Sequence, residues 1–124
     1  MMESPAVAFA RAHLEAWTNH DIDTARGNLA SDVQFFSPAA HLVGVDEYMD
    51  GPRGLVQFAT HVVPGSLKVI AAMGDERNAL IMYQVDTEGG PLGARRFPSA
   101  QTWVLDEHGK IQVERLISYA TARA

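Results

Sequence analysis

Two runs of strand-forming residues near the carboxyl end of the chain constrain the fold more than any other feature. Gln101 to Leu105 and Ile111 to Tyr119 are rich in β-branched and aromatic residues, and the polar segment Asp106 to Gly109 separates them. Gly109 is the residue type that most easily adopts a positive φ. The pattern therefore predicts a β-hairpin.

One face of this hairpin mixes large apolar residues with polar ones. The residues of equal strand parity are Gln101, Trp103, Leu105, Glu114, Leu116 and Ser118. Such a mixture is unusual for a face that only packs against a core, because side chains of equal parity share one environment. We therefore expect a concave face that forms a ligand pocket. If a bulge shifts the parity, Val113, Ile117 and Tyr119 form the inner face instead.

The chain before Gly65 has apolar residues at helical spacing, and the chain after it has the period of strands. Three helices are predicted in the first part, from Pro5 to Trp17, from Ile22 up to Ser31, and from Pro52 up to Pro64. Prolines at the first position of the first and third helices suit helix starts, because their missing N–H is not needed there.

Strands are predicted in both parts of the chain. Val33 to Phe36 forms a short strand that ends before Pro38, because proline cannot donate to a central ladder. Ala39 to Gly54 has no clear pattern apart from one helical turn at Asp46 to Met49. Four antiparallel strands follow, at Leu67 to Ala72, Asn78 to Thr87, Arg95 to Leu105 with Pro98 at a bulge or edge, and Ile111 to Tyr119. Helices followed by such a meander predict an α+β fold in one domain over residues 1–124.

The composition excludes several classes of function. Ten Lys and Arg stand against fifteen Asp and Glu, and no basic run occurs, so nucleic-acid binding is not expected. Cysteine is absent, which excludes disulfides and thiolate chemistry and fits a cytoplasmic protein. No secretory signal or membrane-spanning stretch is expected. Nucleotide-binding and serine-hydrolase motifs are also absent from the sequence, so we expect no cofactor.

Several local motifs, in their order and spacing, resemble one protein family over nearly the whole chain. They are Asn19-His20-Asp21, the run from Leu29 to Pro38, Gly51 to Leu55, and Asp106 to Ile111. They resemble the SnoaL-like branch of the nuclear transport factor two-like superfamily, which includes ketosteroid isomerases, limonene epoxide hydrolase and polyketide cyclases. The resemblance implies a cystatin-like α+β roll, in which a cone-shaped, strongly curved, mainly antiparallel sheet wraps around three N-terminal helices. It also implies a deep apolar pocket and a homodimer formed through the convex sheet face.

The catalytic positions of these relatives are only partly matched. Ketosteroid isomerases have a general-base aspartate before the proline that ends the first strand. This chain has Ser37 there, and a hydroxyl cannot replace a carboxylate as base. Their oxyanion-binding tyrosine and aspartic acid align with His13 and Gln101, which can both donate hydrogen bonds. The residue types of the epoxide hydrolase Asp-Arg-Asp set occur without its spacing, in Asp86, Arg95, Arg96 and Glu114.

Three residues are the candidates for catalysis. Glu114 is the first, because a carboxylate in an apolar cone is desolvated and becomes a better general base. The alternative places Glu114 in solvent beside Arg115. His13, at the border of the buried stripe of the first helix, is either a proton shuttle or polarising donor, or a half-buried packing residue. Gln101 is either a hydrogen-bond donor in the pocket or a residue of the outer face.

In the family fold, the pocket lining is mostly aromatic. Its predicted residues are Trp17, Phe35, Tyr48, Phe58, Tyr83, Trp103, Leu116 and Ser118. Aromatic residues at these spacings also suit an ordinary core. No metal site is expected, because the five histidines lack the spacing of metal ligands.

These observations lead to two hypotheses of function. The first is a small-molecule enzyme of the cyclase or isomerase type, which acts by general acid-base catalysis on an apolar, ring-containing, polyketide-like or terpenoid-like substrate. The second is a non-catalytic dimeric protein that binds an apolar small ligand. In a third reading the protein is a structural dimer whose cone is filled by its own side chains. A bound ligand within hydrogen-bond reach of a carboxylate or histidine separates the first from the second.

Overall fold

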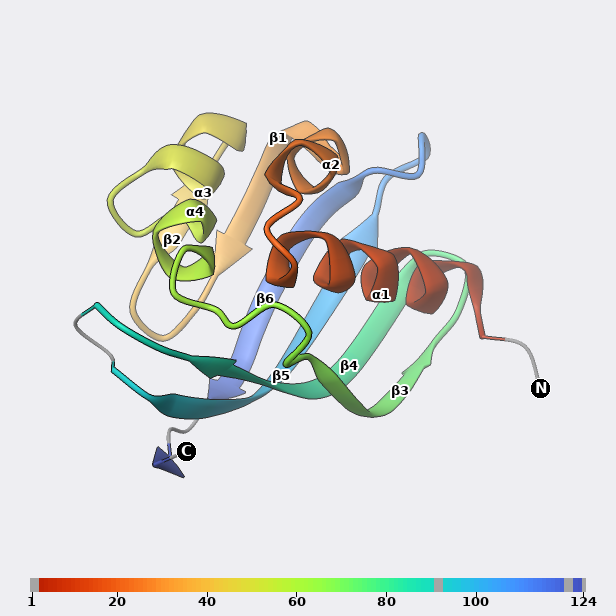
Figure 1. The fold of residues 1–124 in the computed structure, drawn as a ribbon. Coiled ribbons are helices and arrows are strands. Elements are labelled where there is room, and N and C mark those ends of the chain that lie inside the picture. Colours follow the sequence, from red (N-terminus) through yellow and green to blue (C-terminus); the bar gives the residue numbers. More distant parts are fainter. Residues whose placement is uncertain (1–2, 91–92, 120–121, 124) are drawn as a thin grey trace.

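A strongly curved mixed sheet wraps around the helices in the computed structural model, which describes residues 3–90, 93–119 and 122–123 (Figure 1). The elements in chain order are α1 (Pro5–Thr18), α2 (Ile22–Gly27), β1 (Leu29–Phe36), β2 (His41–Val43), α3 (Val45–Asp50), α4 (Leu55–Ala59), β3 (Lys68–Gly74), β4 (Asn78–Thr87), β5 (Arg95–Leu105), β6 (Ile111–Tyr119) and β7 (Ala122–Arg123). The α+β roll predicted from the sequence is confirmed.

The strand order of the sheet is β2-β1-β6-β5-β4-β3, and the short β7 pairs with β5. Strands β3 to β6 form the predicted antiparallel meander. Strand β1 runs parallel to β6, in a register that places Leu29 beside Ile111 and Phe35 beside Glu114. This pairing brings the first strand of the chain next to the strand that carries the candidate base.

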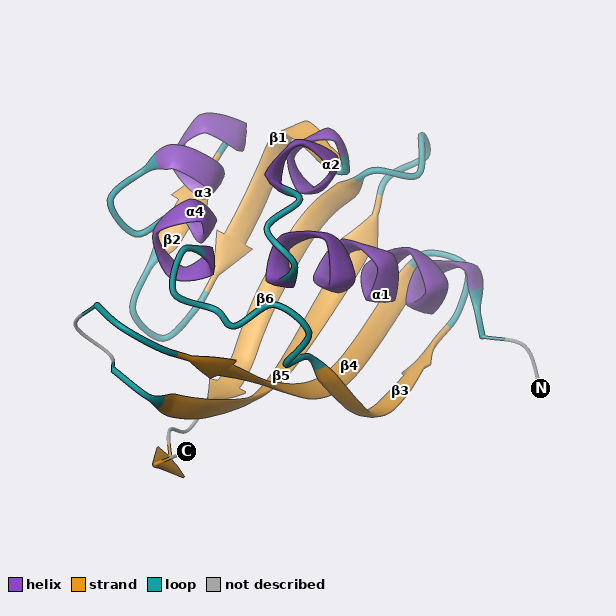
Figure 2. Cartoon of the chain, in the orientation of Figure 1, coloured by secondary structure: helices purple, strands orange, loops and turns teal. Residues whose placement is uncertain are grey.

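Helix α1 lies across the sheet, while α3 and α4 lie together near β1 and β2 (Figure 2). The Ser4 hydroxyl begins α1 by accepting a hydrogen bond from the Val7 N–H at 3.2 Å, and Pro5 occupies the first turn. The buried face of α1 includes Leu14 and Trp17, and it packs against β3, β4 and β5. This face also carries His13.

The structure differs from the sequence prediction where elements are short. Helix α2 ends at Gly27 instead of continuing to Ser31, because Leu29 already pairs with β6. The segment from Ala39 to Gly54 contains β2, which was not predicted, and α3, which includes the helical turn predicted at Asp46 to Met49. The Ser37 hydroxyl accepts hydrogen bonds from the Ala39 and Ala40 N–H groups, which closes the turn that leads β2 back along β1.

The start of the third predicted helix and the position of the bulge in β5 also differ from the prediction. Helix α4 begins at Leu55 instead of Pro52, because Pro52 and Arg53 form a turn. Pro98 pairs in register with Gln84 of β4, and the register between β5 and β6 shifts at Ala100 and Gln101 instead. The bulge therefore lies two to three residues beyond the proline, between Ser99 and Gln101, which both line the cavity.

Candidate active site

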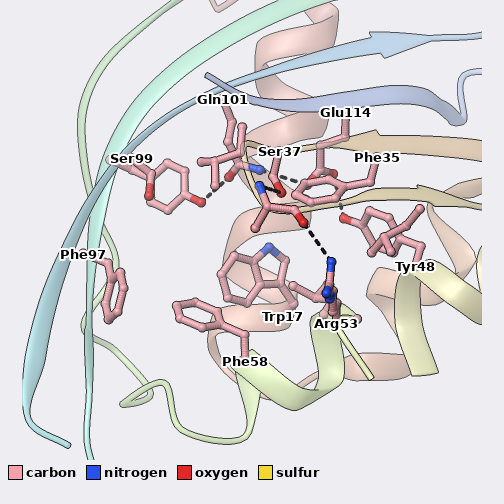
Figure 3. A pocket seen from close by; sticks show the side chains of 16 residues that line it. Trp17, Phe35, Ser37, Tyr48, Arg53, Phe58, Phe97, Ser99, Gln101 and Glu114 are labelled. Atoms are coloured by element: carbon pink, nitrogen blue, oxygen red, sulfur yellow. Dashed lines mark hydrogen bonds between the residues drawn. The ribbon is translucent and has the colours of Figure 1, made fainter. Parts of the chain in front are cut away.

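A cavity of about 320 Å³ opens between the concave face of the sheet and the helices α1, α3 and α4. Aromatic and aliphatic side chains form most of its wall. In Figure 3, Glu114 and Gln101 lie on one side of the cavity, and Trp17 and Phe58 lie on the other. The cone is therefore not filled by its own side chains, which removes the structural-dimer hypothesis.

Glu114 is a carboxylate on the wall of this cavity, and only 3% of the residue is exposed. Its Oε1 accepts hydrogen bonds from the Tyr48 hydroxyl at 2.7 Å and from the Trp103 indole N–H at 2.8 Å. Its Oε2 accepts one from the Gln101 side-chain amide at 2.9 Å. The three donors come from α3 and β5. They fix the carboxylate and leave one Oε2 acceptor position without a protein partner among the described residues.

Gln101 is oriented by Tyr83 of β4. The Tyr83 hydroxyl donates to Gln101 Oε1, so the amide nitrogen of Gln101 must face Glu114. A primary amide nitrogen carries two N–H groups, and only one is used here by a described residue. Gln101 lines the cavity, and the described residues leave this second N–H without a partner.

His13 lies behind Glu114 and does not line the cavity. The residue is fully buried, and its Nε2 is 3.8 Å from Glu114 Oε1, too far for a hydrogen bond. The Asn28 amide nitrogen lies 3.2 Å from His13 Nδ1. An amide nitrogen only donates, so Nδ1 accepts and Nε2 carries the ring proton. Nε2 has no hydrogen-bond partner among the described residues.

Burial moves the proton equilibria of this cluster. It raises the pKa of Glu114 from 4.5 to about 7, and the hydrogen bonds from Tyr48, Trp103 and Gln101 oppose that rise. Burial also lowers the pKa of His13 from 6.5 to about 4, so His13 is neutral at pH 7. The pKa of Tyr48 is raised by burial and then by the charge of Glu114. Glu114 is thus the group of this cluster that titrates near neutral pH.

Six of the predicted pocket residues line the cavity, namely Trp17, Phe35, Tyr48, Phe58, Tyr83 and Leu116. Trp103 does not. It lies fully buried behind Glu114, where its indole N–H donates a hydrogen bond to the carboxylate. The expectation that His13 contacts a substrate oxygen also needs correction, because its ring is separated from the cavity. Ser118 belongs to β6, and its side chain lies outside the described residues.

Sequence reasoning missed several residues of the site, among them Leu42, Leu55 and Phe97 of the cavity wall. Asn28 orients His13, and Arg53 and Ser99 line the cavity. Ser99 lies on β5 at the parity of Gln101, so strand parity alone identifies it. Asn28 and Arg53 lie in short connections without a periodic pattern, and no sequence signal marks them.

The positions that align with catalytic residues of ketosteroid isomerases and limonene epoxide hydrolase make other contacts in this structure. Ser37 lines the cavity, but its hydroxyl holds the turn to β2. Asp86 and Arg96 form an ion pair at 3.1 Å on the outer face of the sheet, away from Glu114. The structure therefore does not assemble an Asp-Arg-Asp set in the cavity from these residues.

The structure offers no cluster of three or more His, Cys, Asp or Glu side chains that would hold a metal, within the part of the chain it describes. Over the same residues, none of the helices combines the length and hydropathy needed to cross a bilayer.

The fold and the cavity define a class of proteins in which a curved sheet and helices enclose a small-molecule pocket. The family model of the SnoaL-like domain matches residues 10–114, and the chain belongs to this family. No curated protein matches the sequence.

Solved structures with a similar fold include proteins of several descriptions. A protein from Kribbella flavida DSM 17836 is 28% identical, with a TM-score of 0.77 over 94% of this chain and 87% of that chain. A protein described as a SnoaL-like polyketide cyclase from Shewanella putrefaciens CN-32 is 16% identical, with a TM-score of 0.72 over 88% and 76% of the two chains. An epoxide hydrolase from M. tuberculosis is 21% identical, with a TM-score of 0.66 over 90% and 80%. The last two likenesses show the fold alone.

Proposed function

We propose that this protein is a small-molecule enzyme of the cyclase or isomerase type, in which Glu114 is the general base. The observation that supports the proposal is a carboxylate on the wall of an apolar cavity. Three donors hold this carboxylate by hydrogen bonds, and burial raises its pKa to about 7. Bases tuned to the working pH transfer protons most effectively, and such groups typically contribute about 10²–10⁴ in rate.

The proposed chemistry begins with a substrate carbonyl oxygen that accepts the free N–H of Gln101. Glu114 Oε2, which is adjacent to that amide, then removes a proton from the carbon next to the carbonyl. The resulting enolate oxygen is stabilised by the Gln101 N–H. Glu114 returns the proton to another carbon in an isomerisation, or to the new alkoxide after the enolate carbon attacks a second carbonyl of the same molecule in a cyclisation.

The aromatic wall supports an apolar, ring-containing substrate. Trp17, Phe58 and Phe97 line the cavity as a row of tilted and edge-to-face rings, with ring centroids 6.0 Å and 5.3 Å apart in successive pairs. A ring of a substrate can pack against such side chains in the offset-stacked or edge-to-face arrangements that aromatic groups prefer. Polyketide-like or terpenoid-like compounds with a ketone fit this description.

The test uses a C–H acid of this shape, 2-tetralone, in deuterated buffer. NMR follows exchange of the protons next to its carbonyl group. We expect the wild-type protein to accelerate exchange and Glu114→Gln, which keeps the fold, to lose the acceleration. Glu107→Gln, in the exposed turn between β5 and β6, is the matched control. Exchange that survives in Glu114→Gln contradicts the proposal.

A second candidate, a binding protein without catalysis, is favoured by the number of donors on Glu114. Three hydrogen bonds occupy most of the acceptor capacity of the carboxylate, as in a purely structural network. In that case ligands bind, and neither the wild type nor Glu114→Gln accelerates exchange.

We also propose that two copies associate through the convex face of the sheet. Met82, Val104 and Ile117 lie on this face and are 46%, 36% and 56% exposed. Met73 of the neighbouring β3 is 66% exposed and pairs with Leu80 on the same face. An apolar surface of this kind on a sheet is typical of a protein interface.

A further inference from the structure

We propose that Arg53 forms a subsite for an anionic group at the mouth of the cavity. The ligand is then an apolar molecule that carries a carboxylate, or a group of the same charge, at one end. This inference rests on the proposed function, because it names the chemistry of the molecule on which Glu114 would act.

The first observation is the distribution of charge around the cavity. Arg53 and Glu114 are the only Asp, Glu, Lys or Arg side chains among the described residues of its wall. Glu114 is buried, while Arg53 is exposed. The cavity therefore has a titrating carboxyl in its interior and a permanent cation at the solvent, with an apolar wall between them.

The second observation is the unused capacity of the Arg53 guanidinium. Its Nη1 donates to the Ala39 carbonyl at 2.8 Å. No carboxylate lies within 4.0 Å of it in the described ranges, whereas Arg11, Arg26 and Arg96 each pair with an acidic side chain. A guanidinium has five N–H donors in a planar fork that matches a carboxylate. Most of these donors remain for a ligand.

The third observation is that both supports of Arg53 are fixed. On one side, Ala39 belongs to the turn that the Ser37 hydroxyl closes. On the other side, the neighbouring Gly54 lies so close to α3 that an added Cβ would be 2.8 Å from the Met49 carbonyl oxygen. The Ala39 carbonyl holds the guanidinium at one nitrogen, and the close approach of Gly54 restricts the backbone beside Arg53, so less freedom is lost on binding, which favours affinity. With a net charge of −5, the protein as a whole repels anions, so a local cation is needed to admit one.

The test compares two bicyclic molecules that differ in charge, 2-naphthoate and 2-naphthamide. Their affinities are measured by NMR titration at low ionic strength. We expect the wild type to bind the carboxylate about fivefold more tightly than the amide, the size of a partly exposed ion pair. Arg53→Gln should remove that preference, and Arg53→Lys should keep part of it. Arg77→Gln, in the exposed turn between β3 and β4, is the matched control and should keep all of it.

Three results overturn the subsite. They are equal affinity of the two molecules for the wild type, a preference that persists in Arg53→Gln, and binding of neither molecule. The proposed function fails by a different measurement, when Glu114→Gln still accelerates proton exchange in 2-tetralone. Glu114→Gln is expected to keep its preference for 2-naphthoate, so the two failures are distinguishable.

Discussion

The side chains of Tyr48 and Glu114 are joined by a hydrogen bond of 2.7 Å, although the two residues lie 66 positions apart in the chain. Tyr48 belongs to α3, a six-residue helix with little stability of its own. The Tyr48 ring also contacts Phe35 edge to face, with ring centroids 5.6 Å apart. A short helix thus supplies both a wall of the cavity and a donor to its carboxyl group.

Replacement of Tyr48 by Phe tests this donor. The ring contact with Phe35 is kept, but Glu114 loses the hydrogen bond that opposes its raised pKa most strongly. We expect the pH profile of 2-tetralone exchange to move to higher pH and the stability to fall by about 1 kcal/mol. The profile comes from NMR and the stability from urea unfolding. An unchanged profile would show that Tyr48 does not set the protonation of Glu114.

The dependence of stability on pH should separate the two buried groups. The folded-state pKa of Glu114 is raised from 4.5 to about 7. Its contribution to the free energy of unfolding is therefore present below pH 4.5 and is lost as the pH rises towards 7. The folded-state pKa of His13 is lowered from 6.5 to about 4, so its contribution is present above pH 6.5 and is lost as the pH falls towards 4. The two slopes oppose each other between pH 4.5 and 6.5.

Single substitutions separate the effects of Glu114 and His13 on the dependence of stability on pH. Relative to the wild type, Glu114→Gln should gain stability more steeply as the pH rises from 4 to 6.5, because only His13 then contributes. His13→Asn should lose stability between pH 4.5 and 7 relative to the wild type. Urea unfolding at a series of pH values measures both effects. Identical slopes in all three proteins would contradict the assignment.

The ring proton of His13 should be on Nε2. Long-range proton–nitrogen NMR correlations distinguish the two neutral tautomers directly. Asn28→Leu removes the donor to Nδ1, so we expect a mixture of tautomers in that variant. Because the Glu114 carboxylate then loses part of the stabilisation that the neighbouring Nε2 N–H gives to its charged form, the pH of optimal exchange activity should rise. His41, whose Nε2 lies 3.0 Å from the Gln34 side-chain oxygen on the surface, is an internal control. An Nδ1 proton in the wild type would contradict this reading of the contact.

Self-association through the convex face should depend on its apolar residues. Met82 alternates with the buried Ile81 and Tyr83 along β4, so a charge at this position faces outward and spares the core. We expect Met82→Lys to shift a dimer towards monomer in size-exclusion chromatography with light scattering. Glu88→Lys, at an exposed position directly after β4, is the control. A wild-type monomer at micromolar concentration would contradict the proposed interface.

The meander and the hairpin were predictable because their strands are long and alternate clearly. The same alternation places Gln101 and Glu114 on one face in the sequence, and the structure has them there. The parity of β6 was harder to predict, because register shifts occur at both ends of its pairing with β5. Of the short elements, α3 was predicted only as the helical turn at Asp46 to Met49, and β2 was not predicted, since three to six residues show little or no period.

The supporting contacts of the site were beyond sequence reasoning for a different reason. Asn28 and His13 are neighbours only because α1 and α2 fold back on each other, and a single asparagine carries no signal of that contact. The position of Trp103 behind Glu114 depends on the direction of its indole N–H. Strand parity predicts that the Trp103 side chain faces inward, but it does not predict which atom its indole N–H contacts.

The parallel pairing of β1 with β6 has a consequence for how the chain acquires its structure. Leu29 and Phe35 reach their places only when Ile111 and Glu114 are available to lie beside them. During synthesis, β1 therefore cannot complete its pairing until β6 has been made, near the end of this sequence. Contacts between such distant segments slow folding, so we expect a nascent chain that ends before β6 to lack both the cavity and the cooperative core around it.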